Sequence, residues 1–240
     1  MKEFKNDLKL SQISKIAGIG YLIIFVTGIF SNFFILEKLF NPNNALSTME
    51  NIISNNLLFR IGFLGFLLMV IFDVILSWAL YLIFEQTDRA LSLLSAILRL
   101  INCAIFGFAL FFLLDILHLV SKPDYLIILG NEKIALDILS SFHSFNSAWL
   151  LGLVFFGIHL FFLGKLIIKS DFFPSWVGVF LYIAGFGYLV DSFANFLYSD
   201  YHNYKDIFQA IVVIPGIIGE FSLTVLLLKK NVKLENKEEV

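Results

Sequence analysis

Apolar residues fall into six long runs along the chain, separated by short polar segments. The runs cover residues 16–36, 57–84, 90–119, 146–168, 176–198 and 207–228. About 20 consecutive apolar residues in an α-helix cross a hydrocarbon core of about 30 Å. The pattern therefore predicts an all-α protein, a bundle of six transmembrane helices that forms one integral membrane domain over residues 1–240.

Composition supports a membrane protein and excludes several other classes. Of 240 residues, 59% are hydrophobic and only 15% are charged, with a mean hydropathy of +0.86. So few charges could not cover the apolar surface of a soluble fold. A net charge of −2 gives no basic surface for nucleic acid. The single cysteine, Cys103, excludes an intrachain disulfide.

Basic residues indicate the orientation of the chain. With the N-terminus inside, eleven Lys and Arg residues fall on the cytoplasmic side and five on the other. Cytoplasmic loops carry such an excess, so we expect both termini in the cytoplasm. The first run is too long for the apolar part of a signal peptide, which indicates a retained span. Tyr21 is expected near the inner membrane interface, where aromatic residues gather.

The connections between the runs differ in length. Residues 85–89 and 170–175 form tight turns, whereas residues 37–56 and 120–145 form long connections that we expect on the outer side. The second long connection holds a short apolar stretch at 125–129 and a helical pattern at 132–139. The charged tail from Lys229 is expected to fray.

Several segments within the runs resemble a known family. The most specific is Gly152-Leu-Val-Phe-Phe-Gly-Ile-His159, and others are Leu58-Phe-Arg-Ile-Gly62 and Gly219-Glu220. Over about residues 16–228 the chain resembles the domain-of-unknown-function 4386 family of bacterial membrane proteins. The resemblance implies a multi-pass protein of the bacterial inner, or plasma, membrane, and it implies no activity.

Ionisable side chains inside the apolar runs are the strongest indication of a site. Burying a charge at membrane depth costs at least about 2.5–3.5 kcal/mol, so such residues are usually paired, line a cavity or serve a function. Nine residues lie within the runs or at their edges: Arg60, Asp73, Arg99, Asp115, His118, His143, His159, Asp191 and Glu220.

Asp73 and Arg99 are predicted to touch. They lie at similar distances before and after the tight turn at 85–89, and their depths therefore differ by roughly 3 Å. Opposite charges in a low dielectric each offset the cost of burying the other. Such a pair is either a structural clamp between two helices or part of a ligand or proton site.

Three more residues are candidates for that ligand or proton site. His159 lies near the middle of the fourth run, and Asp191 lies on a polar and aromatic face of the fifth. Glu220 follows Pro215, which kinks a helix, and burial there disfavours a charged carboxylate. We therefore expect Glu220 to take up a proton more readily than a free carboxyl and to line a central cavity with His159. Helix packing is the alternative role for each of the three.

Asp115, His118 and His143 are weak candidates for a metal site. Two histidines and a carboxylate near one interface could bind zinc in principle. The sequence has no HxxxH or HExxH spacing, so surface histidines in a loop are the favoured interpretation. It also has no GxSxG, P-loop, CxxC or dinucleotide motif, and we expect no cofactor.

Three classes of function follow from these residues. The first is a protein with a buried polar cavity that binds a ligand or couples small-molecule transport to protons. The second is an intramembrane metal-dependent hydrolase that acts on lipid. The third is a structural or regulatory membrane protein in which buried charges only fix helix packing. The expected partners are the lipid bilayer and a small-molecule or lipid ligand, and no oligomeric state follows from the sequence.

Overall fold

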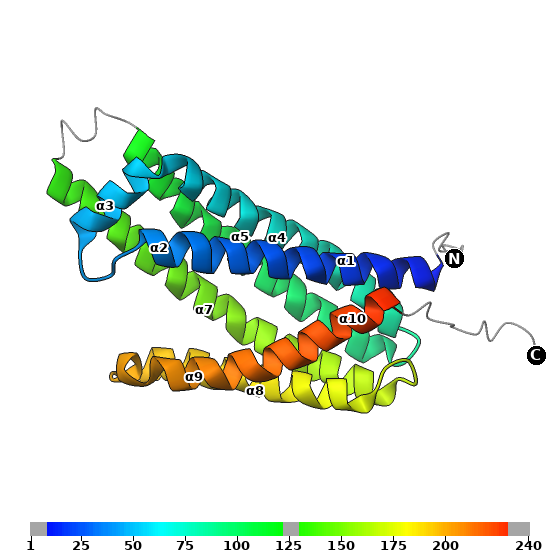
Figure 1. Ribbon diagram of the computed structural model, residues 1–240. Coiled ribbons are helices and arrows are strands. Elements are labelled where there is room, and N and C mark those ends of the chain that lie inside the picture. The colour runs from blue at the N-terminus through cyan, green and yellow to red at the C-terminus, as the bar shows by residue number, and fades with distance from the viewer. Residues whose placement is uncertain (1–8, 122–129, 230–240) are drawn as a thin grey trace, which may run out of the picture. The chain divides into compact units, whose positions relative to one another are not determined.

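The computed structural model describes residues 9–121 and 130–229, apart from the side chain of His202 (Figure 1). Within these ranges the chain is helical and contains no strand. Six helices are long and apolar enough to cross a membrane. The predicted all-α fold with six spans is confirmed, whereas the side of the membrane on which the termini lie stays a prediction.

The six spans correspond closely to the six apolar runs. The second, third and fifth are single helices: α4 (Asn56–Phe84), α5 (Arg89–Ser121) and α8 (Ser175–Leu197). The first and last spans contain a π-helical segment. The first consists of α1 (Leu10–Ile29), η1 (Phe30–Leu36) and α2 (Glu37–Leu39), and the last of α9 (Tyr201–Gly216), η2 (Ile217–Phe221) and α10 (Ser222–Lys229).

The fourth span differs most from its prediction. Helix α7 runs over Asn131–Lys169, so the helical pattern at 132–139 is continuous with the membrane span. The polar run at 140–147 is therefore helical, and His143 lies in a helix and not in a loop. Gly130 starts the helix with a φ of 78°, a backbone conformation that glycine adopts without strain. The apolar stretch at 125–129 and the tail after Lys229 lie outside the described residues.

Side-chain caps explain where two of the helices begin. Helix α3 (Ala45–Ser54) lies in the connection after the first span, and the side chain of Asn44 accepts a hydrogen bond from the backbone N–H of Ser47. Asp88 likewise accepts from the backbone N–H of Leu91 at the start of α5. Each cap satisfies a donor that has no partner within its own helix.

The chain divides into two compact units. Unit 1 contains Met1–Leu22, Asp73–Ile101 and Leu153–Val240, and unit 2 contains Ile23–Phe72 and Asn102–Gly152. Parts of α1, α4, α5 and α7 therefore contribute to each unit. Helix α8 and the last span belong entirely to unit 1.

Paired glycines bring α7 and α8 close together in unit 1. A Cβ atom added to Gly164 would lie 2.7 Å from the carbonyl oxygen of Gly178, and one on Gly178 would lie 2.6 Å from that of Gly164. Gly157 and Gly185 form a second pair of the same kind, with distances of 2.9 and 2.6 Å. Small residues allow this approach, and the backbones then pack directly. Figure 1 shows α9 alongside α8, where Gly187 of α8 meets Ile211 of α9.

Unit 2 is packed around aromatic rings. The rings of Phe106 and Trp149 stack with centroids 3.7 Å apart, and Phe40 and Phe142 stack at the same separation. A Cβ atom on Gly152 would meet Phe106 at 2.6 Å, so this glycine makes room for the stack. Large aromatic rings supply most of the apolar area that such a core buries.

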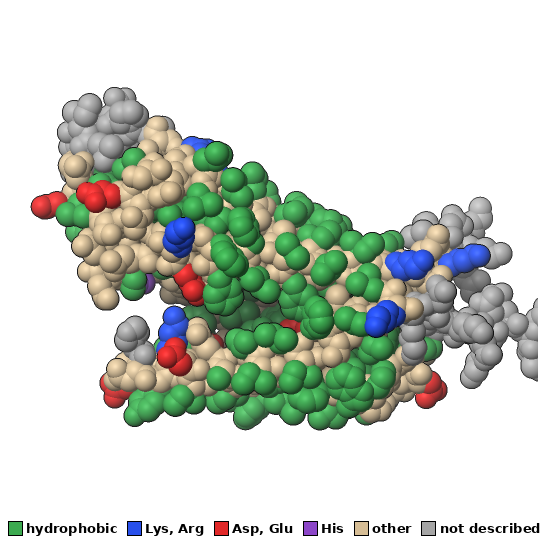
Figure 2. Space-filling model, in the orientation of Figure 1, with side chains coloured by type: hydrophobic (Ala, Val, Ile, Leu, Met, Phe, Trp, Pro, Cys, Tyr) green, Lys and Arg blue, Asp and Glu red, His purple; other side chains and the backbone are tan. Residues whose placement is uncertain are grey.

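Hydrophobic side chains dominate the outer surface as well. On the face shown in Figure 2 they cover the helices over most of their length. Many are well exposed, such as Phe111 at 67% and Phe34 at 61%. A monomeric soluble protein rarely exposes apolar area on this scale. With the six apolar helices, this surface identifies a multi-pass membrane protein.

Candidate functional site

Polar contacts join α4 and α5 in unit 1, and one of them is the predicted ion pair. Ser92 Oγ donates to the carbonyl of Tyr81 at 2.9 Å, and Ser77 Oγ donates to the carbonyl of Ala96 at 2.9 Å. The next position in this antiparallel register places Asp73 opposite Arg99. The two serines thus hold the helices so that the charged side chains meet.

The contact between Asp73 and Arg99 is confirmed. Arg99 Nε donates to Asp73 Oδ1 at 2.7 Å, and Nη2 also pairs with that oxygen. Arg99 is 1% exposed and Asp73 is 4% exposed, so both charges are removed from solvent. A buried pair of this kind depends on the partners and on further hydrogen bonds to offset desolvation.

His159 brings α7 into the same site. Its Nδ1 lies 2.9 Å from the backbone carbonyl of Ser95 and 2.9 Å from that residue's hydroxyl. Its Nε2 lies 3.0 Å from Arg99 Nη1, which can only donate. Nε2 must therefore accept, and Nδ1 carries the proton toward the carbonyl. The hydrogen bonds fix His159 as the neutral Nδ1–H tautomer.

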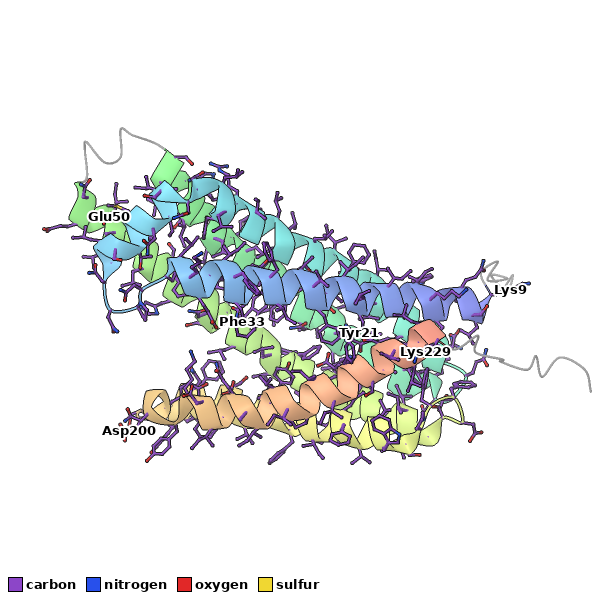
Figure 3. All side chains as sticks on the ribbon, in the orientation of Figure 1. Lys9, Tyr21, Phe33, Glu50, Asp200 and Lys229 are labelled. Carbon is purple, nitrogen blue, oxygen red and sulfur yellow. The ribbon has the colours of Figure 1, made fainter. Side chains whose placement is uncertain are left out.

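Two aromatic rings complete the surroundings of Arg99. Its guanidinium carbon lies 5.3 Å from the ring centre of Tyr21 and 5.3 Å from that of Phe156. Both distances are within the range of a cation–π interaction. Tyr21 is fully buried, and its expected position near the inner membrane interface stays a prediction. Figure 3 shows Tyr21 on the side of α1 that faces α10.

Glu220 is a second buried carboxylate near Arg99. It lies in the π-helical segment η2, is 7% exposed, and is within electrostatic range of Arg99, Asp73, Tyr21 and Tyr188. We call Asp73, Arg99, His159 and Glu220 the buried charge cluster. With Asp73 and Arg99 compensating each other and His159 neutral, an ionised Glu220 leaves the cluster with one net negative charge. A protonated Glu220 leaves it neutral.

The space beside the cluster is narrow. His159 lines a pocket together with Ser77, Ser92 and Ser95, and this pocket is too small to admit a water molecule. On this side of His159 the packing leaves no room for water, and the expected cavity that His159 shares with Glu220 stays a prediction.

Asp191 lies near the C-terminal end of α8. Its Oδ1 accepts a hydrogen bond from the hydroxyl of Tyr201 at 2.7 Å, and its side chain is within electrostatic range of Lys205. Tyr188 lies within electrostatic range of both Asp191 and Glu220. Tyr188 therefore lies near both carboxylates.

The weak metal candidates are not gathered into one site. Asp115 of α5 accepts from Ser141 Oγ of α7 at 2.7 Å, while His118 and His143 are exposed on their helices. Among residues 9–121 and 130–229, no three His, Cys, Asp or Glu residues are arranged to hold a metal ion. Arg60 does not pair with Asp115 and instead donates to Asn56 at 2.6 Å and to Ser121 at 3.0 Å.

Comparisons with known proteins agree with the sequence resemblance. The family model described as "Domain of unknown function (DUF4386)" matches residues 16–230. An uncharacterized protein of Archaeoglobus fulgidus is 32% identical over 132 residues, which cover 55% of this chain. The match spans 65% of that protein's length. No solved structure matches the chain.

Proposed function

We propose that this chain, which belongs to the DUF4386 family, transports a small molecule across the plasma membrane of a bacterium. Transport is coupled to protons, and Glu220 is the proton site. One observation carries the proposal: a second buried carboxylate lies within electrostatic range of an arginine that is already paired. Glu220 can compete with Asp73 for Arg99 when it is ionised, and it cannot when it is protonated. One proton thereby controls which helices Arg99 holds together.

The broken last span supports a moving part at this position. Pro215 cannot donate a backbone hydrogen bond, and the π-helical segment η2 follows directly. Single π-helical turns occur frequently at functional sites, and interrupted helices line the binding sites of many transporters. Glu220 lies in this interrupted segment, so a change in its charge acts where the helix has alternative hydrogen bonds.

The close packing beside His159 favours a second candidate function. Arg99 contacts Asp73, His159, Tyr21 and Phe156, and this set of contacts also suits a structural clamp that only fixes helix packing. The hydrolase alternative has less support, because no metal-binding group of three is found within the described ranges.

Cysteine accessibility separates transport from a clamp without knowledge of the substrate. Thr224 is 1% exposed and lies one turn after Glu220. We expect Thr224→Cys, in a Cys103→Ala background, to react with a membrane-impermeant thiol reagent faster at high pH, when an ionised Glu220 competes for Arg99. The rate is normalised to that of Asn146→Cys, an exposed position, to remove the intrinsic effect of pH on thiols.

The matched control is Ala109→Cys, which is buried in unit 2, lies ten residues after Arg99 in α5, and should stay unreactive at every pH. A Thr224→Cys protein that is equally unreactive throughout would contradict transport and support the clamp.

A further inference from the structure

A groove lies between α5 and α7 in unit 2. It has a volume of about 710 Å³ and is open to the outside. Phe108 and Phe112 of α5 form one wall, and Phe108 is 58% exposed. The other wall, from α7, has polar side chains at Ser140, His143, Ser144 and Ser147, with the apolar Ala148 and Leu151 after them and the apolar Leu136 and Leu139 before them. Along α7 the groove therefore changes from polar to apolar between Ser147 and Ala148, and a second apolar section lies at Leu136 and Leu139.

The length of the helices shows where this change of polarity lies. About 20 helical residues cross the hydrocarbon core. Counted back along α7 from Lys165, roughly 20 residues reach Phe145. Counted forward along α5 from Arg89, roughly 20 residues reach Ala109. Both counts place the boundary between hydrocarbon and head groups within the groove.

The polar section of the groove and its apolar section at Ala148 and Leu151 match the two parts of a lipid molecule. On the hydrocarbon side of the boundary, Phe108 and Leu151 offer an apolar surface. On the head-group side, Ser140, His143 and Ser144 offer hydroxyl and imidazole groups. Hydroxyls and imidazole can donate to phosphate oxygens.

An acidic side chain lies beside the groove and is not part of its lining. Asp115 is exposed on α5, one turn after Phe112, and accepts a 2.7 Å hydrogen bond from Ser141, in the polar run at 140–147 of α7. A carboxylate does not favour an anionic head group, but it attracts an ammonium group. Together, the donors and Asp115 complement a head group that carries both a phosphate and an amine.

We propose that this groove binds one phospholipid with a zwitterionic, amine-bearing head group, of which phosphatidylethanolamine is the simplest. The phosphate accepts hydrogen bonds from Ser140, Ser144 and His143. The ammonium donates to Asp115. One acyl chain lies along Phe108 and Leu151. The site is independent of the proton site proposed above.

Native mass spectrometry of the full chain tests the proposal. Detergent-solubilised protein is mixed with equal amounts of phosphatidylethanolamine, phosphatidylcholine and phosphatidylglycerol, and retained lipid is measured. We expect phosphatidylethanolamine to be retained preferentially as a single molecule. Ser144→Phe, which fills the groove, should abolish that retention. Asn146→Phe is the matched control, because Asn146 is exposed on α7 at similar depth and does not line the groove.

A milder variant tests the head-group contact separately. Asp115→Asn keeps the shape of the side chain and removes its charge, so preference for phosphatidylethanolamine over phosphatidylglycerol should fall roughly tenfold, as expected for one charge-assisted hydrogen bond. Equal retention of the three lipids by wild type, or unchanged retention in Ser144→Phe, would overturn the proposal. A dimer that Ser144→Phe converts to monomer would also overturn it, because the groove would then hold a second copy through the small residues Ser140, Ser144 and Ala148.

Discussion

At the scale of single residues, Arg99 organises the buried charge cluster. It contacts α4 through Asp73, α7 through His159 and Phe156, and α1 through Tyr21. A guanidinium suits this position because it stays protonated and has donors in several directions. A lysine would keep the charge but could not serve both Asp73 and His159 with the same geometry.

We therefore expect Arg99→Ala to destabilise the protein strongly, by about 3–5 kcal/mol, because it leaves the carboxylate of Asp73 buried without its countercharge. Asp73→Ala together with Arg99→Ala should recover part of the loss, since neither charge then remains uncompensated. Unfolding in mixed micelles with increasing denaturing detergent measures both effects. Additive losses in the double variant would show that the pair is not energetically coupled.

Asp88 provides a contrast at the membrane edge, because its ion pair is partly exposed. Lys169 Nζ donates to Asp88 Oδ2 at 2.7 Å, and this hydrogen bond holds the pKa of Asp88 below its ordinary value of 3.8. A lowered folded-state pKa contributes stability that is present above pH 3.8 and is lost as the pH falls through the folded value. Thermal unfolding midpoints of wild type should therefore approach those of Asp88→Asn on acidification. The difference should be small and should shrink in high salt.

Much of the cluster could be predicted from the sequence, because charged residues stand out in an apolar run. The depth count along the α4–α5 hairpin predicted the contact of Asp73 with Arg99, and the position of His159 near the middle of the fourth run made it a candidate for the same site. Tyr21 and Phe156 could not be found in this way, because aromatic residues are common throughout the chain. Ser95 lies one turn before Arg99 in a polar stripe, and that spacing was the available signal for its contact with His159.

At the scale of helices, paired glycines determine how α7 and α8 cross. Gly157 and Gly164 on α7 are seven residues apart, as are Gly178 and Gly185 on α8, so both pairs lie on one face of each helix. Along α7, His159 lies between Gly157 and Gly164, and so between the two close contacts with α8. The sequence showed the glycines, but their partners depend on the register between helices, which one sequence does not display.

Gly185→Ala should destabilise the protein by about 1–3 kcal/mol, because its Cβ would lie 2.6 Å from the carbonyl oxygen of Gly157. Gly107→Ala is the matched control, since a Cβ there meets nothing within 4 Å. Alanine favours a helix over glycine by up to about 1 kcal/mol, so the control should be neutral or slightly stabilising. Equal thermal stability of the two variants would show that the crossing tolerates a wider separation.

At the scale of the whole molecule, hydropathy alone predicted the six spans but misjudged where the fourth begins. Helix α7 extends to Asn131 because its first turns, although more polar, continue the helical pattern without a breaking residue. A length of 39 residues corresponds to about 58 Å, which exceeds the hydrocarbon core by a wide margin. Span counting therefore locates helices in the membrane but does not show how far they extend beyond it.

Orientation is the main prediction at this scale. Reporter fusions at Lys133 and Lys230 should lie on opposite sides of the membrane, with Lys230 in the cytoplasm, because eleven basic residues lie on the expected inner side and five on the other. Alkaline phosphatase and green fluorescent protein fusions report the two sides. Both positions on the same side would contradict the six-span topology.

The most direct test of the proton site is an infrared titration of Glu220. Difference spectra between high and low pH, recorded on reconstituted protein, report the carbonyl band of a buried carboxylic acid. Wild type should gain this band on acidification, and Glu220→Gln should lack it while folding normally, since glutamine keeps the shape and cannot take up the proton. Glu50→Gln, at an exposed position on α3, should retain the band. A band that persists unchanged in Glu220→Gln would show that the proton resides elsewhere and would contradict the proposed function.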